Sequence, residues 1–138
     1  MAGSILVVDD DHEILDLTSA VLRDGGYRVL TASGGRDGIA IARSEQPDLI
    51  LLDINMDDLD GWSTLRLIRL DPDTAAIPVA MFSVRYDLAE KMEALKRSAD
   101  DYIVKPFGYD ELIERVGRIL EHGRTGAAGG AERGSARP

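Results

Sequence analysis

The sequence lacks cysteine altogether, and its hydrophobic runs are short. Without cysteine there can be neither a disulfide framework nor a thiolate metal site, and a reducing compartment is compatible with the chain. The first apolar run, residues 5–8, is stopped at once by three aspartates, which excludes a signal peptide or a membrane span there. We therefore expect a cytoplasmic protein that does not associate with membranes.

Basic residues are scarce as well. Lys and Arg number 16 against 25 Asp and Glu, which gives a formal net charge of −9. Nucleic-acid backbones are bound by clustered basic side chains, so this balance argues against nucleic-acid binding by this domain. A chain of 138 residues with 44% hydrophobic content can bury one sizeable core but is short for two ordinary domains.

The apolar residues that are present alternate between two patterns. Runs rich in β-branched residues lie at 5–8, 50–52 and 79–82, with shorter extended pieces at 27–31 and 102–104. Helical spacing joins the apolar residues that lie between and after these runs: Ile14, Val21 and Leu22; Ile39, Ala40 and Ala42; Leu65 and Ile68; Leu88, Met92 and Leu95; Leu112, Val116, Ile119 and Leu120. This alternation predicts an α/β fold with a doubly wound five-stranded parallel sheet.

Glycine and proline mark the ends of the predicted elements. Gly25 and Gly26 end the first helix, Pro72 follows the third, and Pro47 and Pro78 precede two strands. From residue 123 onward the sequence has no periodicity and almost no large apolar side chain. We expect a domain over residues 1–122 and a disordered tail or linker stub over residues 123–138.

Polar side chains gather where the predicted strands end, which is where doubly wound sheets bind their ligands. They are Asp9, Asp10 and Asp11 after the first strand, Asp53 after the third, Ser83 after the fourth and Lys105 after the fifth. Oxygen ligands clustered without His or Cys favour Mg²⁺. The sequence therefore predicts a metal site at Asp10 and Asp53.

The same cluster has the parts of a phosphoryl acceptor. A carboxylate held beside a divalent ion can act as a nucleophile on phosphorus. Lys105 supplies a cation and Ser83 a hydroxyl donor for the remaining phosphoryl oxygens. On its own, Lys105-Pro106 can also be no more than a strand end with a rigid stop.

These residues also carry a resemblance to a known family. Five motifs lie in order between residues 4 and 121: Val7-Val8-Asp9-Asp10-Asp11, Leu51-Leu52-Asp53-Ile54-Asn55-Met56, Asp60-Gly61, Ser83, and Asp101-Tyr102-Ile103-Val104-Lys105-Pro106-Phe107. In these motifs the chain resembles the receiver domains of bacterial response regulators, which act in two-component phosphorelay signalling. The resemblance implies a flavodoxin-like (βα)5 fold with strand order 2-1-3-4-5.

The resemblance also assigns roles at the site. It implies that Asp53 is the phosphoacceptor and forms an aspartyl phosphate. Asp10, together with the backbone carbonyl of Asn55, is implied to bind Mg²⁺, and Asp9 is implied to assist through the acidic pocket.

A switch and a set of partners are further implications. Tyr102 is implied to rotate inward when Ser83 moves toward the phosphoryl group, although alone it can equally be a half-buried aromatic of an edge strand. The implied donor is a sensor histidine kinase or a phosphotransfer protein. An unknown downstream protein would read the surface of the fourth helix, fifth strand and fifth helix, and a phosphorylation-dependent dimer is left open. The implied protein is not an enzyme, because self-catalysis is confined to accepting and losing its own phosphoryl group.

Three residues depart from the usual receiver pattern. Asp57 replaces a common proline after Met56 and adds a negative charge beside the pocket. Val84 stands where a smaller residue is usual, and Ser98 replaces a common glycine. The first two changes bear on the rates of phosphorylation and dephosphorylation.

Several residues near the site have ordinary structural interpretations. Asp11 is expected to cap the first helix. Trp62 is expected to pack within a helix. The cluster Asp57, Asp58 and Asp60 is expected to form a solvated acidic loop that adds to the local field.

Other functions fit the residues less well. An aspartate-based phosphatase needs a second acid/base aspartate two residues after the nucleophile, and that position is Asn55. A flavodoxin-like electron carrier is disfavoured because Asp9, Asp10 and Asp11 would repel the phosphate of FMN. A degenerate receiver, acting as a phosphorylation-independent protein interaction module, stays open as the alternative.

Overall fold

The structure, a computed structural model, describes residues 3–83, 99–104 and 108–123. Its strands are β1 (Ser4–Val8), β2 (Arg28–Ala32), β3 (Leu49–Asp53), β4 (Val79–Ser83) and β5 (Asp101–Val104). Its helices are α1 (His12–Asp24), α2 (Gly35–Glu45), α3 (Gly61–Leu70) and α5 (Tyr109–His122). The predicted fourth helix and residues 124–138 of the predicted tail lie outside the described residues.

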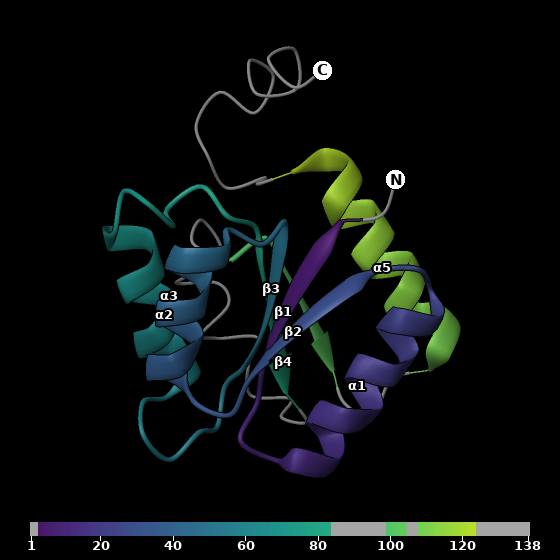
Figure 1. The fold of residues 1–138 in the computed structure, drawn as a ribbon, viewed down its shortest axis with the longest axis horizontal. Coiled ribbons are helices and arrows are strands. Elements are labelled where there is room, and N and C mark those ends of the chain that lie inside the picture. Colours follow the sequence, from purple (N-terminus) through teal and green to yellow (C-terminus); the bar gives the residue numbers. More distant parts are fainter. Residues whose placement is uncertain (1–2, 84–98, 105–107, 124–138) are drawn as a thin grey trace.

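The five strands form one parallel sheet in the order β2-β1-β3-β4-β5 (Figure 1). The predicted doubly wound sheet and its strand order are therefore confirmed. β3 is longer at both ends than the predicted run 50–52, because Leu49 and Asp53 are buried like the residues between them. The order reverses between β1 and β3, which places the ligand-binding crevice beyond the carboxyl ends of these two strands.

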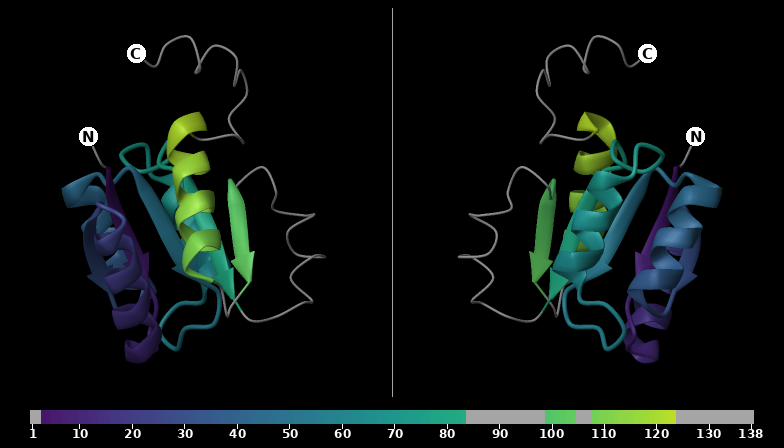
Figure 2. Two further views of the ribbon diagram at one scale, coloured as in Figure 1. Left: turned by 90° about the vertical axis from the view of Figure 1, so that its right-hand side faces the viewer. Right: turned by 90° about the vertical axis from the view of Figure 1, so that its left-hand side faces the viewer.

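Helices cover both faces of the sheet, with α1 and α5 on one face and α2 and α3 on the other (Figure 2). Successive strand residues point to opposite faces, so each strand supplies both cores. Ile5 and Leu51 pack with the α1 and α5 side, whereas Leu6 and Ile50 pack with the α2 and α3 side. Each such fully buried side chain contributes about 1.5–3 kcal/mol relative to an exposed one.

The helices begin and end at residues suited to those positions. Asp11 accepts hydrogen bonds from the backbone N–H groups of Glu13 and Ile14 at the start of α1, which confirms the predicted cap. The amide of Gly25, the C-cap of α1, donates to the carbonyl of Val21. These caps fix where the β1–α1 connection ends and thus where the aspartates of that connection lie.

A buried ion pair lies at the amino ends of strands β4 and β5, away from the crevice at the carboxyl ends. Arg69 of α3 lies 3.1 Å from the carboxylate of Asp100, whose side chain is fully buried. The same guanidinium donates to the carbonyls of Ala75 and Ile77, and the Asp100 carboxylate accepts from the N–H of Val79. Removing one partner of a buried pair costs about 3–5 kcal/mol, so this network anchors the starts of β4 and β5.

Within the part of the chain that the structure describes, no helix is long and apolar enough to cross a membrane.

Candidate metal centre

Three carboxylates meet beyond the carboxyl ends of the two central strands. Val8 of β1 pairs with Leu52 of β3, so Asp9 and Asp53, one residue further along each strand, lie level with one another. Asp10 follows Asp9. One ligand oxygen from each of these three aspartates lies within 4.8 Å of the others.

Backbone amides hold two of these side chains in place. Asp9 is fully buried, and its carboxylate accepts a hydrogen bond of 2.9 Å from the N–H of Asp11. Asp10 is partly buried and accepts one of 3.0 Å from the N–H of Asp57. Asp53 is only 5% exposed at the end of the fully buried strand β3. The carboxylates are thus positioned by the fold rather than free in solvent.

The arrangement fits one Mg²⁺ ion. Oxygen ligands on an octahedral Mg²⁺ lie about 3 Å apart when adjacent and about 4.2 Å apart when opposite, because each bond is about 2.1 Å long. The carboxylate oxygens of Asp9, Asp10 and Asp53, within 4.8 Å of one another, need only small rotations to reach such spacings. Hard carboxylate oxygens are also the donors that Mg²⁺ prefers.

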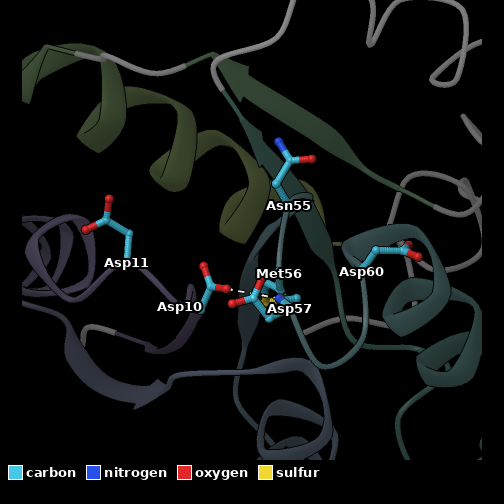
Figure 3. Close-up of a pocket in the computed structure, with 6 residues that line it drawn as sticks. All are labelled: Asp10, Asp11, Asn55, Met56, Asp57 and Asp60. Carbon is cyan, nitrogen blue, oxygen red and sulfur yellow. Dashed lines mark hydrogen bonds between the residues drawn. The ribbon is translucent and has the colours of Figure 1, made fainter.

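An open pocket lies next to the cluster (Figure 3). It is lined by Asp10, Asp11, Asn55, Met56, Asp57 and Asp60. Figure 3 shows Asp10 and Asp57 joined by their hydrogen bond, with Asn55 above them and Asp60 near the start of α3. The pocket is open to solvent beside Asp10, and Asn55 lies on its wall as an exposed residue.

Glycine closes the loop between β3 and α3. The N–H of Gly61 donates to the carbonyl of Ile54 at 2.8 Å. A Cβ at Gly61 would lie 2.3 Å from the backbone oxygen of Asp53, a distance that real Cβ contacts do not reach. Only glycine permits this approach, which brings α3 directly against the end of β3.

The acidic loop does more than the sequence predicts. Asp58 accepts hydrogen bonds from the N–H groups of Gly35 (3.0 Å) and Arg36 (3.1 Å) at the start of α2. The N–H of Arg36, followed by that of Gly35, lowers the pKa of Asp58 below its ordinary value. Asp60 caps α3 by accepting from the N–H of Ser63. Asp57, Asp58 and Asp60 are exposed, as expected of a solvated acidic loop, and two of them also cap helices, which was not predicted.

One signal in the sequence points to the Asp58 cap. The residue before α2 is Gly34, which has no side chain to cap the helix. The free N–H groups of a helix start need acceptors, which water, a ligand or a side chain from elsewhere in the chain can supply. Nothing in the sequence says that the loop carrying Asp58 supplies one here.

The structure places the other predicted site residues only in part. Ser83 ends β4 and pairs with Val104 of β5, at the same edge of the sheet as Asp53. Tyr102 lies in β5 opposite Met81. The side chains of Ser83 and Tyr102 lie outside the described part of the structure, as does Lys105 entirely. Their roles stay predictions.

The two other positions that depart from the receiver pattern, Val84 and Ser98, also lie outside the described residues. Trp62, by contrast, is described in full. It lies in the first turn of α3 and packs against the core beside α2 and α3, as expected of a residue that serves packing.

The chain is similar in sequence to response regulators and their receiver domains. The family model of the response regulator receiver domain matches residues 5–117. The DNA-binding dual master transcriptional regulator RpaA of Synechocystis sp. is 40% identical over 116 residues, which are 84% of this chain and 48% of RpaA. Protein PilH of Pseudomonas aeruginosa is 35% identical over 116 residues, which are 84% of this chain and 96% of PilH.

A solved structure shows the same likeness. The receiver domain of the sensor histidine kinase PA1611 from Pseudomonas aeruginosa PAO1, with a magnesium ion coordinated in its active-site cleft, superposes with a TM-score of 0.79. It is 28% identical in sequence, and the match covers 87% of this chain and 98% of that one. The chain spans about half the length of the first curated relatives that it matches.

Proposed function

This chain belongs to the family of response regulator receiver domains, which are signalling modules, and from that premise we propose that it accepts a phosphoryl group on Asp53. The donor is a sensor histidine kinase or a phosphotransfer protein of a two-component phosphorelay. The observation that carries the proposal is the position of Asp53, buried at the end of central strand β3 within 4.8 Å of the ligand oxygens of Asp9 and Asp10.

The chemistry assigned to Asp53 is nucleophilic. One carboxylate oxygen of Asp53 forms a bond to phosphorus while the bond from phosphorus to the donor nitrogen of a phosphohistidine breaks, leaving the electron pair on that nitrogen. Asp9, Asp10, Asp53 and the backbone carbonyl of Asn55 are the residues that would hold Mg²⁺, which neutralises charge on the transferring group.

Two predicted donors complete the acceptor site. Ser83 would donate its hydroxyl and Lys105 its ammonium group to the remaining phosphoryl oxygens. Both act only on the chain's own phosphoryl group, so no external substrate is turned over. The charge that the site must offset is large, since a phosphoryl group brings about 1.5–2 negative charges.

Phosphorylation is proposed to change the surface that partners read. Movement of Ser83 toward the phosphoryl group would let Tyr102 turn inward and alter the surface of the fourth helix, β5 and α5. The downstream protein is unknown, and a phosphorylation-dependent dimer is one form that the output can take. A net charge of −9 supports a role for this domain without nucleic-acid binding. We propose that the domain acts in the cytoplasm. We place the domain at residues 1–122.

The proposal is tested by intact-mass measurement after incubation with acetyl phosphate. Wild-type protein is expected to gain one phosphoryl group in Mg²⁺ and far less in excess EDTA. The control variant Asp48→Asn should gain the phosphoryl group like wild type. Asp48 is exposed at the opposite end of β3, where it accepts a hydrogen bond from the N–H of Ser4. A wild type that takes no phosphoryl group would instead favour a phosphorylation-independent interaction module.

A further inference from the structure

We propose that the backbone N–H of Asp57 is a positioning group for Asp10, and that it sets how tightly the carboxylate cluster binds Mg²⁺. The proposal rests on the proposed function of that cluster and adds a residue to it. The side chain of Asp57 is not proposed as a metal ligand. The amide acts through Asp10 alone.

The first support is the hydrogen bond itself. The N–H of Asp57 lies 3.0 Å from Oδ2 of Asp10, across 47 residues of sequence. Among the residues that the structure describes, this amide is the only hydrogen-bond donor to the Asp10 carboxylate. Asp10 is partly exposed, so without this contact its side chain would sample several rotamers. One oxygen is thus held by the loop while Oδ1 stays available to a metal.

The second support is that the amide cannot easily follow Asp10 if that side chain moves. Asp58, the next residue, uses both carboxylate oxygens on the N–H groups of Gly35 and Arg36. The loop is closed at its end by the hydrogen bond from Gly61 to Ile54. The amide of residue 57 is therefore fixed to the frame of α2 and β3.

The consequence for metal binding follows from general behaviour of ligating carboxylates. Groups that hydrogen-bond a metal ligand orient it in advance, and their loss commonly weakens metal affinity by about 10–100-fold. A fixed Asp10 loses less rotational freedom when Mg²⁺ binds than a mobile one. Losing this amide should therefore weaken Mg²⁺ binding even though every ligand remains.

The side chain of Asp57 makes a separate contribution that must be distinguished. Its carboxylate is exposed on the pocket rim and attracts a cation through the local field. Such an exposed charge is screened by salt, because the Debye length is about 8 Å at physiological ionic strength. The hydrogen bond to Asp10 is short and direct, so its effect should depend much less on salt.

Two variants separate the amide from the charge. Asp57→Ala removes the carboxylate and keeps the N–H, whereas Asp57→Pro removes both. Mg²⁺ titrations can be followed by the fluorescence of Trp62, the single tryptophan. The Asp57→Ala variant should lose a few-fold in Mg²⁺ affinity, and this loss should shrink with added salt. The Asp57→Pro variant should bind Mg²⁺ about tenfold or more weakly than Asp57→Ala at every salt concentration.

A third chain removes the N–H without fixing the backbone as proline does. In Asp57→Ala protein, the amide that residue 57 contributes is replaced by an ester, through incorporation of lactic acid at this position. This ester chain should match the proline variant in Mg²⁺ affinity. An ester chain that binds Mg²⁺ as tightly as Asp57→Ala would overturn the proposal, whatever proline does.

A measurement without metal tests the contact independently of the proposed function. In Asp10→Ala protein, hydrogen exchange of the residue 57 amide should be at least tenfold faster than in wild type, while the Gly61 amide, bonded to Ile54, should be unchanged. Unchanged protection at residue 57 would overturn the positioning role.

Failure of the proposed function gives a different result. If the wild type binds no Mg²⁺, both the metal centre and the role of Asp57 in it are ruled out. A wild type that binds Mg²⁺ and gains a phosphoryl group, with equal affinities for the alanine and ester chains, would sink only the role of Asp57.

Discussion

Replacing Asp10 by asparagine should raise the stability of the metal-free protein, and Mg²⁺ should reduce that gain. The asparagine side chain keeps an oxygen that can accept the hydrogen bond from the N–H of Asp57, so the loop contact survives. The substitution removes one of three negative charges whose oxygens lie within 4.8 Å of one another. It therefore relieves repulsion in the metal-free protein and removes a ligand from the metal-bound one.

At 4.8 Å, the upper limit of the oxygen separations in this cluster, two ionised carboxylates repel by about 3.5 kcal/mol at an effective dielectric constant of about 20. Because Asp10 is partly exposed, solvent screening reduces the gain on its removal to about 1–2 kcal/mol. At a Mg²⁺ concentration of about 100 Kd, the wild type gains about 2.7 kcal/mol from binding. A variant with tenfold weaker affinity gains about 1.4 kcal/mol.

Urea denaturation in EDTA and in Mg²⁺, followed by Trp62 fluorescence, measures these free energies of unfolding. The Asp10→Asn variant should be more stable than wild type in EDTA, and Mg²⁺ should reduce that advantage by about 1.3 kcal/mol. Asp16→Asn, which removes the same charge from the exposed surface of α1, should change neither value by more than about 0.5 kcal/mol. A variant that is less stable than wild type in EDTA and responds fully to Mg²⁺ would show that Asp10 neither repels its neighbours nor binds the metal.

Three further predictions concern the loop and the switch. Gly61→Ala should cost about 1–3 kcal/mol in urea denaturation, because its Cβ would meet the backbone of β3, whereas Gly108→Ala, in open space, should cost far less. Asp58→Ala should cost about 0.5–2 kcal/mol at pH 7. Because the lowered pKa of Asp58 means stability present above its unfolded pKa and lost as pH falls through the folded one, the difference from wild type should shrink below about pH 4. Ser83→Ala should still bind beryllofluoride, but NMR shifts at Tyr102 should no longer change, and equal shifts in both proteins would count against Ser83 as the coupling residue.

The fold was predictable because its signals are local. Runs of buried apolar residues mark the strands, and the Gly26 boundary, where φ is +97°, and the Pro78 boundary depend on the conformational limits of single residues. Parallel pairing then places Asp9 and Asp53 at one edge without any knowledge of side-chain packing. Parallel pairing therefore made the gathering of the carboxylates predictable. Their roles in binding Mg²⁺ and accepting a phosphoryl group stay predictions.

Contacts made by loops were not predictable from the sequence. The hydrogen bond from Asp57 to Asp10 joins residues 47 apart, and the Asp58 cap joins residues 22 and 23 apart. Such pairs depend on the path of one loop, which propensity and periodicity do not specify. The Arg69–Asp100 pair, 31 residues apart, was missed for the same reason, since neither residue lies in a patterned motif.

Mapping the phosphorylated residue decides whether Asp53 is the acceptor. Protein phosphorylated with acetyl phosphate in Mg²⁺ is reduced with borohydride, which converts an aspartyl phosphate to homoserine, and the peptides are sequenced by mass spectrometry. Homoserine is expected at residue 53 alone, and Asp53→Asn protein should yield none. Homoserine at Asp9 or Asp10 in wild type, or equal phosphorylation of the Asp53→Asn variant, would contradict the assignment of Asp53 as the acceptor.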